Sequence, residues 1–215
     1  MRRLRRAVAG GLLAFIGLVA AQHPLRSDLP AGGHFISEYA KGSTATLQFV
    51  AFACWAIALG AGAALAARAP APPGRRRARG AVALGLGLAG AGIVLSALFA
   101  TQTVAGVLPP GVPRTTEGRL HDIGTLAAFA GLALAAAASL RLDVQRSYRV
   151  SLAALTAILV LTVPALVALG IDAPGIGQRV FILVACTFQW RLAVELTPAA
   201  PARQGELDRE RPAAA

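Results

Sequence analysis

Residues 80–113 read GAVALGLGLAGAGIVLSALFATQTVAGVLPPGVP and contain no charged side chain. Two further blocks, residues 123–140 and 150–171, are equally free of charge. Each block is long enough to cross the roughly 30 Å of hydrocarbon in a bilayer as an α-helix. The helices of soluble proteins keep a polar stripe toward water, and these blocks have none. The sequence therefore predicts an integral membrane protein built from transmembrane helices.

The composition of the whole chain also indicates a membrane protein. Of its 215 residues 56% are hydrophobic, against roughly 45–50% in soluble domains. The formal net charge is +11, but the basic residues lie in short runs between the apolar blocks. This arrangement is typical of orientation signals in membrane proteins and not of a nucleic-acid-binding surface. We therefore expect the lipid bilayer, with its headgroups, as the partner of this chain, and no nucleic acid.

Apolar segments alternate with polar or proline-rich connections, which predicts an all-α, polytopic membrane helix bundle with about six transmembrane helices. The expected spans are residues 7–22, 44–67, 80–100, 120–140, 150–170 and 180–196. Residues 198–215, rich in Pro, Ala and charge, are expected to form a disordered tail. The first span follows a basic stub and ends near Val19-Ala20-Ala21, so a cleaved signal peptide is the alternative to a retained helix.

The distribution of basic residues predicts the orientation of the bundle. With the N-terminus inside, five of the 21 basic residues fall on the outer side, which leaves sixteen on the inner side. The five are Arg26, Lys41, Arg114, Arg119 and Arg179. Because Lys and Arg accumulate on the cytoplasmic side of membrane proteins, we expect both termini in the cytoplasm and the chain in the plasma membrane.

The sequence of residues 85–90, GLGLAG, matches the glycine pattern of dinucleotide-binding loops. That interpretation requires a preceding strand and an acidic residue about 20 positions later, and the sequence has neither. Within a membrane span, small residues allow two helices to approach closely. Gly85 and Ala89 share one helix face, which we interpret as a packing face. A second such face holds Ala83, Gly87 and Ala91.

Polar residues gather where three expected spans begin on the outer side. The candidate binding residues are Ser37, Glu38, His121, Asp122, Gln178 and Arg179. They come from three separate segments, and each lies at or just before the start of a span that enters from outside. An arginine at the membrane edge favours a carboxylate partner. We therefore expect Arg179 to pair with Asp122 or Glu38, and His121 to face the same pocket.

Two interpretations of this outer group remain open. In the first, His121, Asp122 and Glu38 are the candidate catalytic residues of an acid–base reaction. In the second, Asp122 stabilises a helix N-terminus and His121 lies in the membrane interface. All three histidines fall on the outer side with several carboxylates, but their spacing matches no known zinc motif. The sequence therefore predicts neither a metal site nor a cofactor.

Several features together resemble the bacterial membrane family known as domain of unknown function 998. They are the six-span loop pattern, ISEY at residues 36–39, LHDIG at residues 120–124, and GQRV at residues 177–180 with Trp190 downstream. The resemblance implies the six-helix architecture but no reaction, since that family has no established activity. The chain is also distantly similar to eukaryotic six-span proteins linked to lipid-anchor remodelling and autophagy.

Three functions remain compatible with these features. The leading hypothesis is a membrane protein without an assigned reaction that acts as a scaffold or a lipid-binding component. The alternatives are a membrane hydrolase or lipid-modifying enzyme with a His/carboxylate site on the outer face, and a small-solute transporter. Convergence of His121, Asp122, Glu38 and Arg179 into one pocket favours the enzyme, and a continuous polar path favours transport. No span centre carries an ionisable residue, which argues against proton-coupled transport.

Overall fold

A computed structural model describes residues 1–70, 72–142, 148–150, 152 and 173–197 of the chain. The described part is helical and holds no strand, apart from an isolated bridge between Val104 and Val107. The long helices are α1 (Arg2–Leu25), α2 (Ala45–Arg68), α3 (Arg76–Leu98), α4 (Thr116–Ser139) and α6 (Pro174–Glu195). Three short 3-10 helices are η1 (Ile36–Ala40), η2 (Gly42–Thr44) and η3 (Pro73–Arg75). The predicted all-α class is confirmed for these residues.

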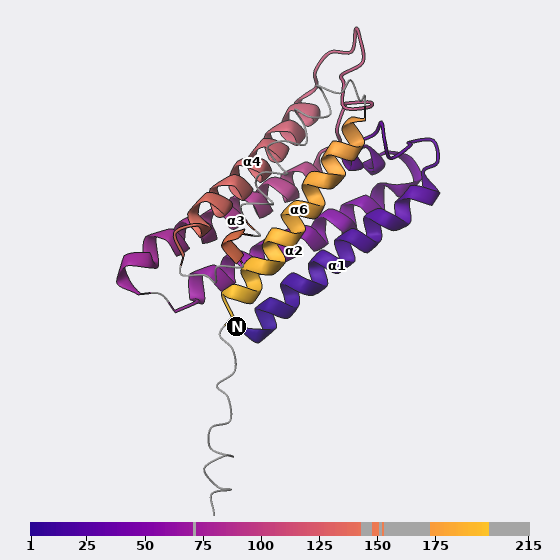
Figure 1. Ribbon diagram of the computed structural model, residues 1–215. Helices are drawn as coiled ribbons and strands as arrows, with labels where there is room; N and C mark the ends of the chain where they lie inside the picture. Colours follow the sequence, from indigo (N-terminus) through magenta and orange to yellow (C-terminus); the bar gives the residue numbers. More distant parts are fainter. Residues whose placement is uncertain (71, 143–147, 151, 153–172, 198–215) are drawn as a thin grey trace, which may run out of the picture.

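Figure 1 shows the long helices side by side in one bundle. Four of them, with their adjoining 3-10 turns, are long and apolar enough to cross a membrane: α1, α2, α3 and α4. Helix α6 covers the sixth expected span, but it carries Arg179, Gln189 and Arg191 along its length, which lowers its apolar content. The fifth expected span, residues 150–170, lies outside the described residues except at its beginning. The described helices therefore form a multi-pass membrane bundle.

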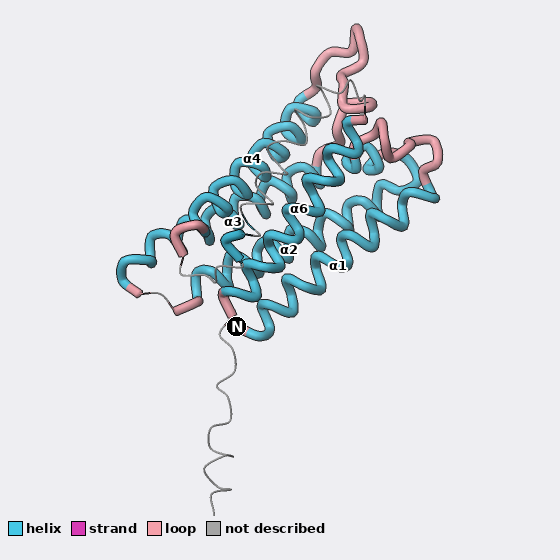
Figure 2. The backbone as a smooth tube through the Cα atoms, viewed as in Figure 1, coloured by secondary structure: helices cyan, strands magenta, loops and turns pink. Residues whose placement is uncertain are grey.

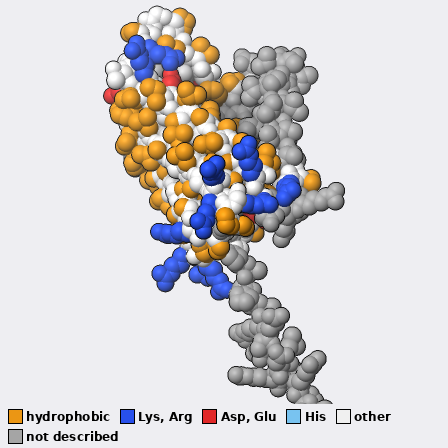
Figure 3. Space-filling view, turned by 90° about the vertical axis from the view of Figure 1, so that its left-hand side faces the viewer, with side chains coloured by type: hydrophobic (Ala, Val, Ile, Leu, Met, Phe, Trp, Pro, Cys, Tyr) orange, Lys and Arg blue, Asp and Glu red, His pale blue; other side chains and the backbone are white. Residues whose placement is uncertain are grey.

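The outward faces of the helices are apolar as well. Leu13, Ile57, Leu84 and Leu126 are each more than 60% exposed. Figure 3 shows hydrophobic side chains over the middle of the bundle, with Lys and Arg toward its ends. Such a surface is suited to lipid tails and not to water.

Glycines bring helices α3 and α4 into backbone contact. A Cβ atom added to Gly85 would lie 2.6 Å from the carbonyl oxygen of Gly131, and one added to Gly124 would lie 2.7 Å from that of Gly92. Real Cβ atoms essentially never come this close to another atom. Because lipid tails are as apolar as the helices themselves, close van der Waals packing is a principal attraction between them. The predicted packing face at Gly85 and Ala89 is therefore confirmed.

The second predicted packing face of α3 is wrong at Gly87 and Ala91, although Ala83 of that face is partly buried against the core. Gly87 and Ala91 are exposed, and a Cβ on Gly87 would meet no atom within 4 Å. Helix α3 instead turns the neighbouring face toward α2, where a Cβ on Gly90 would lie 3.4 Å from the Cβ of Leu59. With α4 and α2 on two sides, the third side of α3 faces outward. A pattern of small residues shows that a close approach is possible, but not which face has a neighbour.

Helix α1 joins the bundle through α2. A Cβ on Gly11 would lie 2.7 Å from the carbonyl oxygen of Cys54, and the rings of Phe15 and Trp55 stack with their centres 4.7 Å apart. Helix α6 packs against both α1 and α2. The chain thus places α1, α2, α3 and α4 in sequence, each against the next, and α6 returns to the α1–α2 side. This arrangement brings the connections after α1 and α3 to the same end of the bundle as the start of α6.

A matched pair of substitutions tests the α3–α4 contact. Replacing Gly85 by Ala should lower the melting temperature in detergent, because the new methyl group meets the α4 backbone and overpacking costs about 1–3 kcal/mol. Replacing Gly87 by Ala in the same helix should leave the melting temperature equal or higher, since Ala is about 1 kcal/mol better than Gly in a helix interior. Equal melting temperatures for the two variants would show that the helices do not meet at Gly85.

Candidate functional site

The end of the bundle that is expected to face outside, which we call the outer end, is closed by ordered loops. Figure 2 shows the α1–α2 and α3–α4 connections gathered at one end, beside the beginning of α6. Within the first connection, η1 buries Ile36, Ser37, Glu38 and Tyr39. Loop side chains are ordinarily exposed, so this burial indicates that the connection is part of the folded structure. We call the two connections and the first turns of α6 the outer cap.

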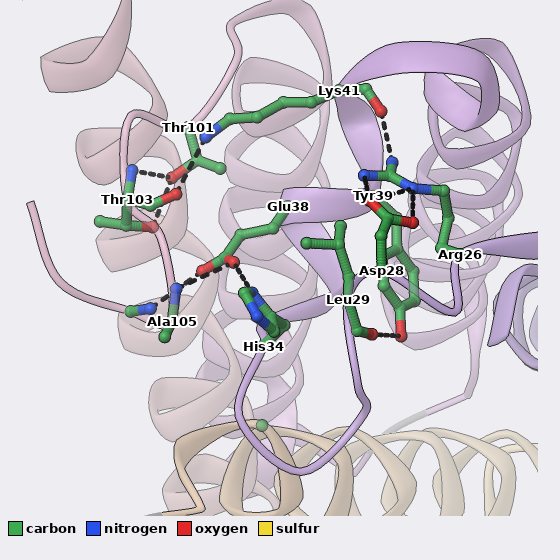
Figure 4. Close-up of polar contacts among 12 residues, drawn as sticks. Arg26, Asp28, Leu29, His34, Glu38, Tyr39, Lys41, Thr101, Thr103 and Ala105 are labelled. Atoms are coloured by element: carbon green, nitrogen blue, oxygen red, sulfur yellow. Dashed lines mark hydrogen bonds and ion pairs between the residues drawn. The ribbon is translucent and has the colours of Figure 1, made fainter. Parts of the chain in front are cut away.

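Glu38 ties the first connection to the second. Its carboxylate accepts hydrogen bonds from the N–H groups of Ala105 at 3.0 Å and Gly106 at 2.9 Å, and it lies 2.6 Å from Nδ1 of His34 (Figure 4). Ala105 and Gly106 have φ angles of 51° and 77°. Successive N–H groups in such turns can point toward a single anion. Only 2% of Glu38 is exposed, and its two oxygens are engaged within the cap, which indicates a structural role.

Two further basic side chains hold the same loops. Lys41 donates from Nζ to the carbonyl oxygen of Thr103 at 2.9 Å, which is a second tie between the two connections. Arg26 donates to the carbonyl oxygen of Lys41, to Oγ1 of Thr44 and to the Asp28 carboxylate. The hydrogen bond from Arg26 lowers the pKa of the Asp28 carboxyl below its usual value. Asp28 is 64% exposed, so this ion pair contributes little to stability.

Arg179 joins α6 to the first connection and to the end of α1. Its Nη1 donates to three carbonyl oxygens, its Nη2 to a hydroxyl group and its Nε to an imidazole nitrogen. These acceptors are Ala31 at 2.7 Å, His34 at 2.8 Å, Gly175 at 2.9 Å, the Tyr39 hydroxyl at 2.8 Å and His23 Nε2 at 3.0 Å. Nδ1 of His23 lies 2.9 Å from the carbonyl oxygen of Val19. This contact assigns the His23 proton to Nδ1 and leaves Nε2 to accept from Arg179.

The expected pairing of Arg179 with Asp122 or Glu38 is wrong. Asp122 forms its ion pair with Arg114, and Glu38 forms its own with His34. Arg179 reaches no carboxylate among the described residues. Carbonyl and hydroxyl oxygens surround its guanidinium, so backbone dipoles replace the water that the group loses, and no opposite charge is needed.

His121 is held by the end of helix α3. Its Nδ1 lies 3.0 Å from the carbonyl oxygen of Ser96 and 2.9 Å from that of Phe99. Both are acceptors, so Nδ1 carries a proton, and in the neutral imidazole Nε2 keeps its lone pair. No described residue forms a hydrogen bond with Nε2. The side chain is 5% exposed, and it combines a fixed orientation with a free acceptor atom.

A cavity of about 790 Å³ lies behind the outer cap. Its wall is apolar on α2, α4 and α6, with Phe52, Trp55, Phe129 and Phe181 as the largest side chains. Polar groups line it near the cap: Ser37, Thr101, Thr103, Arg114, His121, Asp122, Thr125 and Gln178. Ligand pockets in proteins are commonly about 300–1,000 Å³ and mostly apolar with a few polar groups. This cavity has both properties.

The structure divides the six predicted binding residues into two groups. Ser37, His121, Asp122 and Gln178 line the cavity. Glu38 and Arg179 instead engage in the hydrogen bonds of the outer cap described above. Gln178 belongs to both groups, because its Oε1 accepts from the Ile36 N–H at 2.7 Å.

Sequence reasoning missed the aromatic wall of the cavity and the residue Arg114. Phe52, Trp55 and Phe129 lie inside apolar spans, where nothing in the pattern separates a side chain facing a cavity from one facing lipid or protein. Arg114 lies in an irregular proline-rich stretch, eight positions before its partner Asp122. No periodicity relates positions in such a stretch. Within the described ranges, no group of three or more His, Cys, Asp and Glu side chains is placed to hold a metal ion.

The role of Arg179 is tested by two substitutions and a control. Arg179→Ala should lower the free energy of unfolding by at least about 2 kcal/mol, because it leaves several partly buried acceptors unpaired. Arg179→Lys should restore only part of the loss, since an ammonium group has three donors and lacks the planar fork of a guanidinium. Arg119→Ala, at an exposed arginine of the same end, should change little. Equal melting temperatures for Arg179→Ala and Arg119→Ala would contradict this assignment.

Comparison with known protein families identifies the family of the chain. A family model described as "Protein of unknown function (DUF998)" matches residues 8–195, which include every described long helix for most or all of its length. No curated protein and no solved structure matches the chain. The match spans the Ser37-Glu38, His121-Asp122 and Gln178-Arg179 pairs, whose positions the fold brings to one end of the bundle. The chain belongs to the family of domain of unknown function 998.

Proposed function

We propose that this protein is a lipid-binding component of the membrane, with the cavity behind the outer cap as its binding site. The observation that carries the proposal is the lining of the cavity. Aromatic and aliphatic side chains form its wall, and hydroxyl, amide and imidazole groups line it near the cap. An amphiphile has the same division, with an apolar tail and a polar head.

The position of the cavity also suits a lipid. Its polar residues come from η1, from the α3–α4 connection and from the outer turns of α4 and α6. Its apolar wall includes side chains of α2, α4 and α6, and the rings of Phe129 on α4 and Phe181 on α6 are in edge-to-face contact. A lipid headgroup at the outer membrane interface would therefore meet polar groups, while its chain would follow the apolar wall.

A lipid-modifying enzyme is the second candidate function, and one observation favours it. The free Nε2 of His121 lies on a side chain that lines the cavity, where it could accept a proton from a bound molecule. The carboxylates proposed to assist it are otherwise engaged, because Asp122 pairs with Arg114 and Glu38 belongs to the outer cap. Lipid binding needs none of these groups to react, so it remains the leading proposal.

We propose six spans for the whole chain, with both termini in the cytoplasm of a cell bounded by its plasma membrane. The excess of basic residues at the inner ends supports this orientation. Retention of α1 is supported by its packing, since Phe15 stacks on Trp55. A cysteine placed at Ser27 or Thr115 should react with an impermeant label in intact cells, and one at Ala78 should not. Labelling at Ala78 alone would reverse the orientation.

The lipid-binding proposal is tested by narrowing the cavity. Ala133 and Ala130 lie one turn apart on α4 and are both exposed, but Ala133 lines the cavity and Ala130 does not. Protein purified in mild detergent should carry lipid that mass spectrometry detects. Ala133→Trp should reduce the lipid retained per protein about fivefold or more, because the indole ring occupies the cavity. Ala130→Trp, with the same gain in size, should retain the wild-type amount.

Two results would contradict lipid binding in this cavity. One is wild-type protein that carries no lipid after mild purification. The other is an Ala133→Trp variant that melts at the wild-type temperature and keeps the wild-type amount of lipid.

A further inference from the structure

The polar lining of the cavity selects among lipids, and we infer that the ligand is a neutral glycerolipid whose free hydroxyl group donates to Nε2 of His121. This inference rests on the proposed lipid-binding function and names the class of lipid. It is carried by three features of the described residues: a fixed acceptor, the absence of a free cation in the lining, and neutral donors near the same end.

The fixed acceptor is His121. The carbonyl oxygens of Ser96 and Phe99 hold a proton on Nδ1, so Nε2 of the neutral imidazole is a hydrogen-bond acceptor. The side chain is 5% exposed, and a buried acceptor without a partner is unfavourable by about 1–3 kcal/mol. A ligand that fills the cavity and displaces water must therefore bring a donor to this atom. A hydroxyl group is such a donor, whereas an ester or an ether is not.

The charges of the described lining cancel. Arg114 and Asp122 are its charged residues, and they form an ion pair with each other. A phosphate group in the cavity would find no unpaired cation, and it would approach the Asp122 carboxylate. Phosphate sites in proteins ordinarily offer Arg, Lys or several backbone N–H groups to the anion. The lining therefore favours an uncharged headgroup over a phospholipid.

Two neutral side chains that line the cavity near the cap can also donate hydrogen bonds to a ligand. Gln178 accepts from Ile36 through Oε1, which leaves its Nε2 hydrogens free to donate. Ser37 adds a hydroxyl group from η1. A diacylglycerol has one hydroxyl group and two ester carbonyls on a three-carbon head. Its hydroxyl matches His121, and its carbonyls match donors of the kind that Gln178 and Ser37 provide.

The experiment compares three lipids with the same acyl chains: 1,2-diacylglycerol, its methyl ether at the free hydroxyl, and phosphatidic acid. Binding to the purified full-length chain in detergent is measured by native mass spectrometry or by displacement of a fluorescent lipid. Wild-type protein should bind diacylglycerol about tenfold more tightly than the methyl ether, the effect of one lost hydrogen bond at a buried acceptor. It should also prefer diacylglycerol over phosphatidic acid.

The substitution His121→Asn tests the acceptor role of Nε2 separately from the structural role of Nδ1. An Asn side chain keeps an N–H donor near the position of Nδ1, so the end of α3 retains its partner, but it has no atom at the position of Nε2. This variant should lose the tenfold preference for diacylglycerol over the methyl ether. The wild-type comparison needs no variant, so the inference stays testable if His121→Asn does not fold.

The outcomes separate a failure of this inference from a failure of the proposed lipid binding. Equal binding of diacylglycerol and its methyl ether to wild-type protein would leave lipid binding intact and overturn the hydroxyl contact. Tighter binding of phosphatidic acid would overturn the assignment of a neutral headgroup. Binding of none of the three, together with no effect of Ala133→Trp on retained lipid, would remove the lipid-binding proposal itself.

Discussion

The hydrogen bonds of the partly buried Arg179 guanidinium are the interactions on which the outer end of this molecule depends. It lies where α6 begins, and it donates to groups at the end of α1, in the first connection and on Tyr39 of η1. Since Glu38 of the same η1 binds the backbone at Ala105 and Gly106, the connection between α3 and α4 is held indirectly as well. Three segments distant in sequence thus become one folded cap, and the cavity lies directly behind it.

The helices could be predicted from the sequence because a helix that crosses a bilayer requires a long apolar run. Most of α3 lies within such a run, the uncharged block of residues 80–113. The packing face at Gly85 followed from residue size alone. The face at Gly87 failed, because its environment depends on where α2 and α4 lie. The partners of Arg179 could not be predicted, since most are backbone carbonyls in irregular loops. His121 was placed correctly at the same end of the bundle as Ser37 and Gln178, but the role of its Nε2 depends on the contacts of Nδ1 with Ser96 and Phe99.

The polar residues at the outer end have two different roles, and this explains why some are charged and others are neutral. Glu38 is buried and Arg179 is partly buried, and the charged groups of both are engaged in hydrogen bonds, which suits residues that hold loops together. Ser37, His121 and Gln178 are neutral, and two of them present free hydrogen-bonding atoms on side chains that line the cavity. A polar rim of this kind, beside an apolar wall, is the arrangement that an amphiphile requires. Lipid binding therefore requires a cap that is rigid enough to keep these polar side chains in place.

Hydrogen exchange at the Ala105 and Gly106 amides tests that requirement most directly, because both N–H groups donate to the buried Glu38 carboxylate. We predict slow exchange at both amides in the wild-type protein, and exchange about tenfold faster or more in Glu38→Gln, whose amide offers one acceptor oxygen in place of two. Asp28→Asn, the same change at an exposed acid of the same loop, should leave both rates unaltered. Exchange at the rate of an unstructured loop in the wild-type protein would contradict the account.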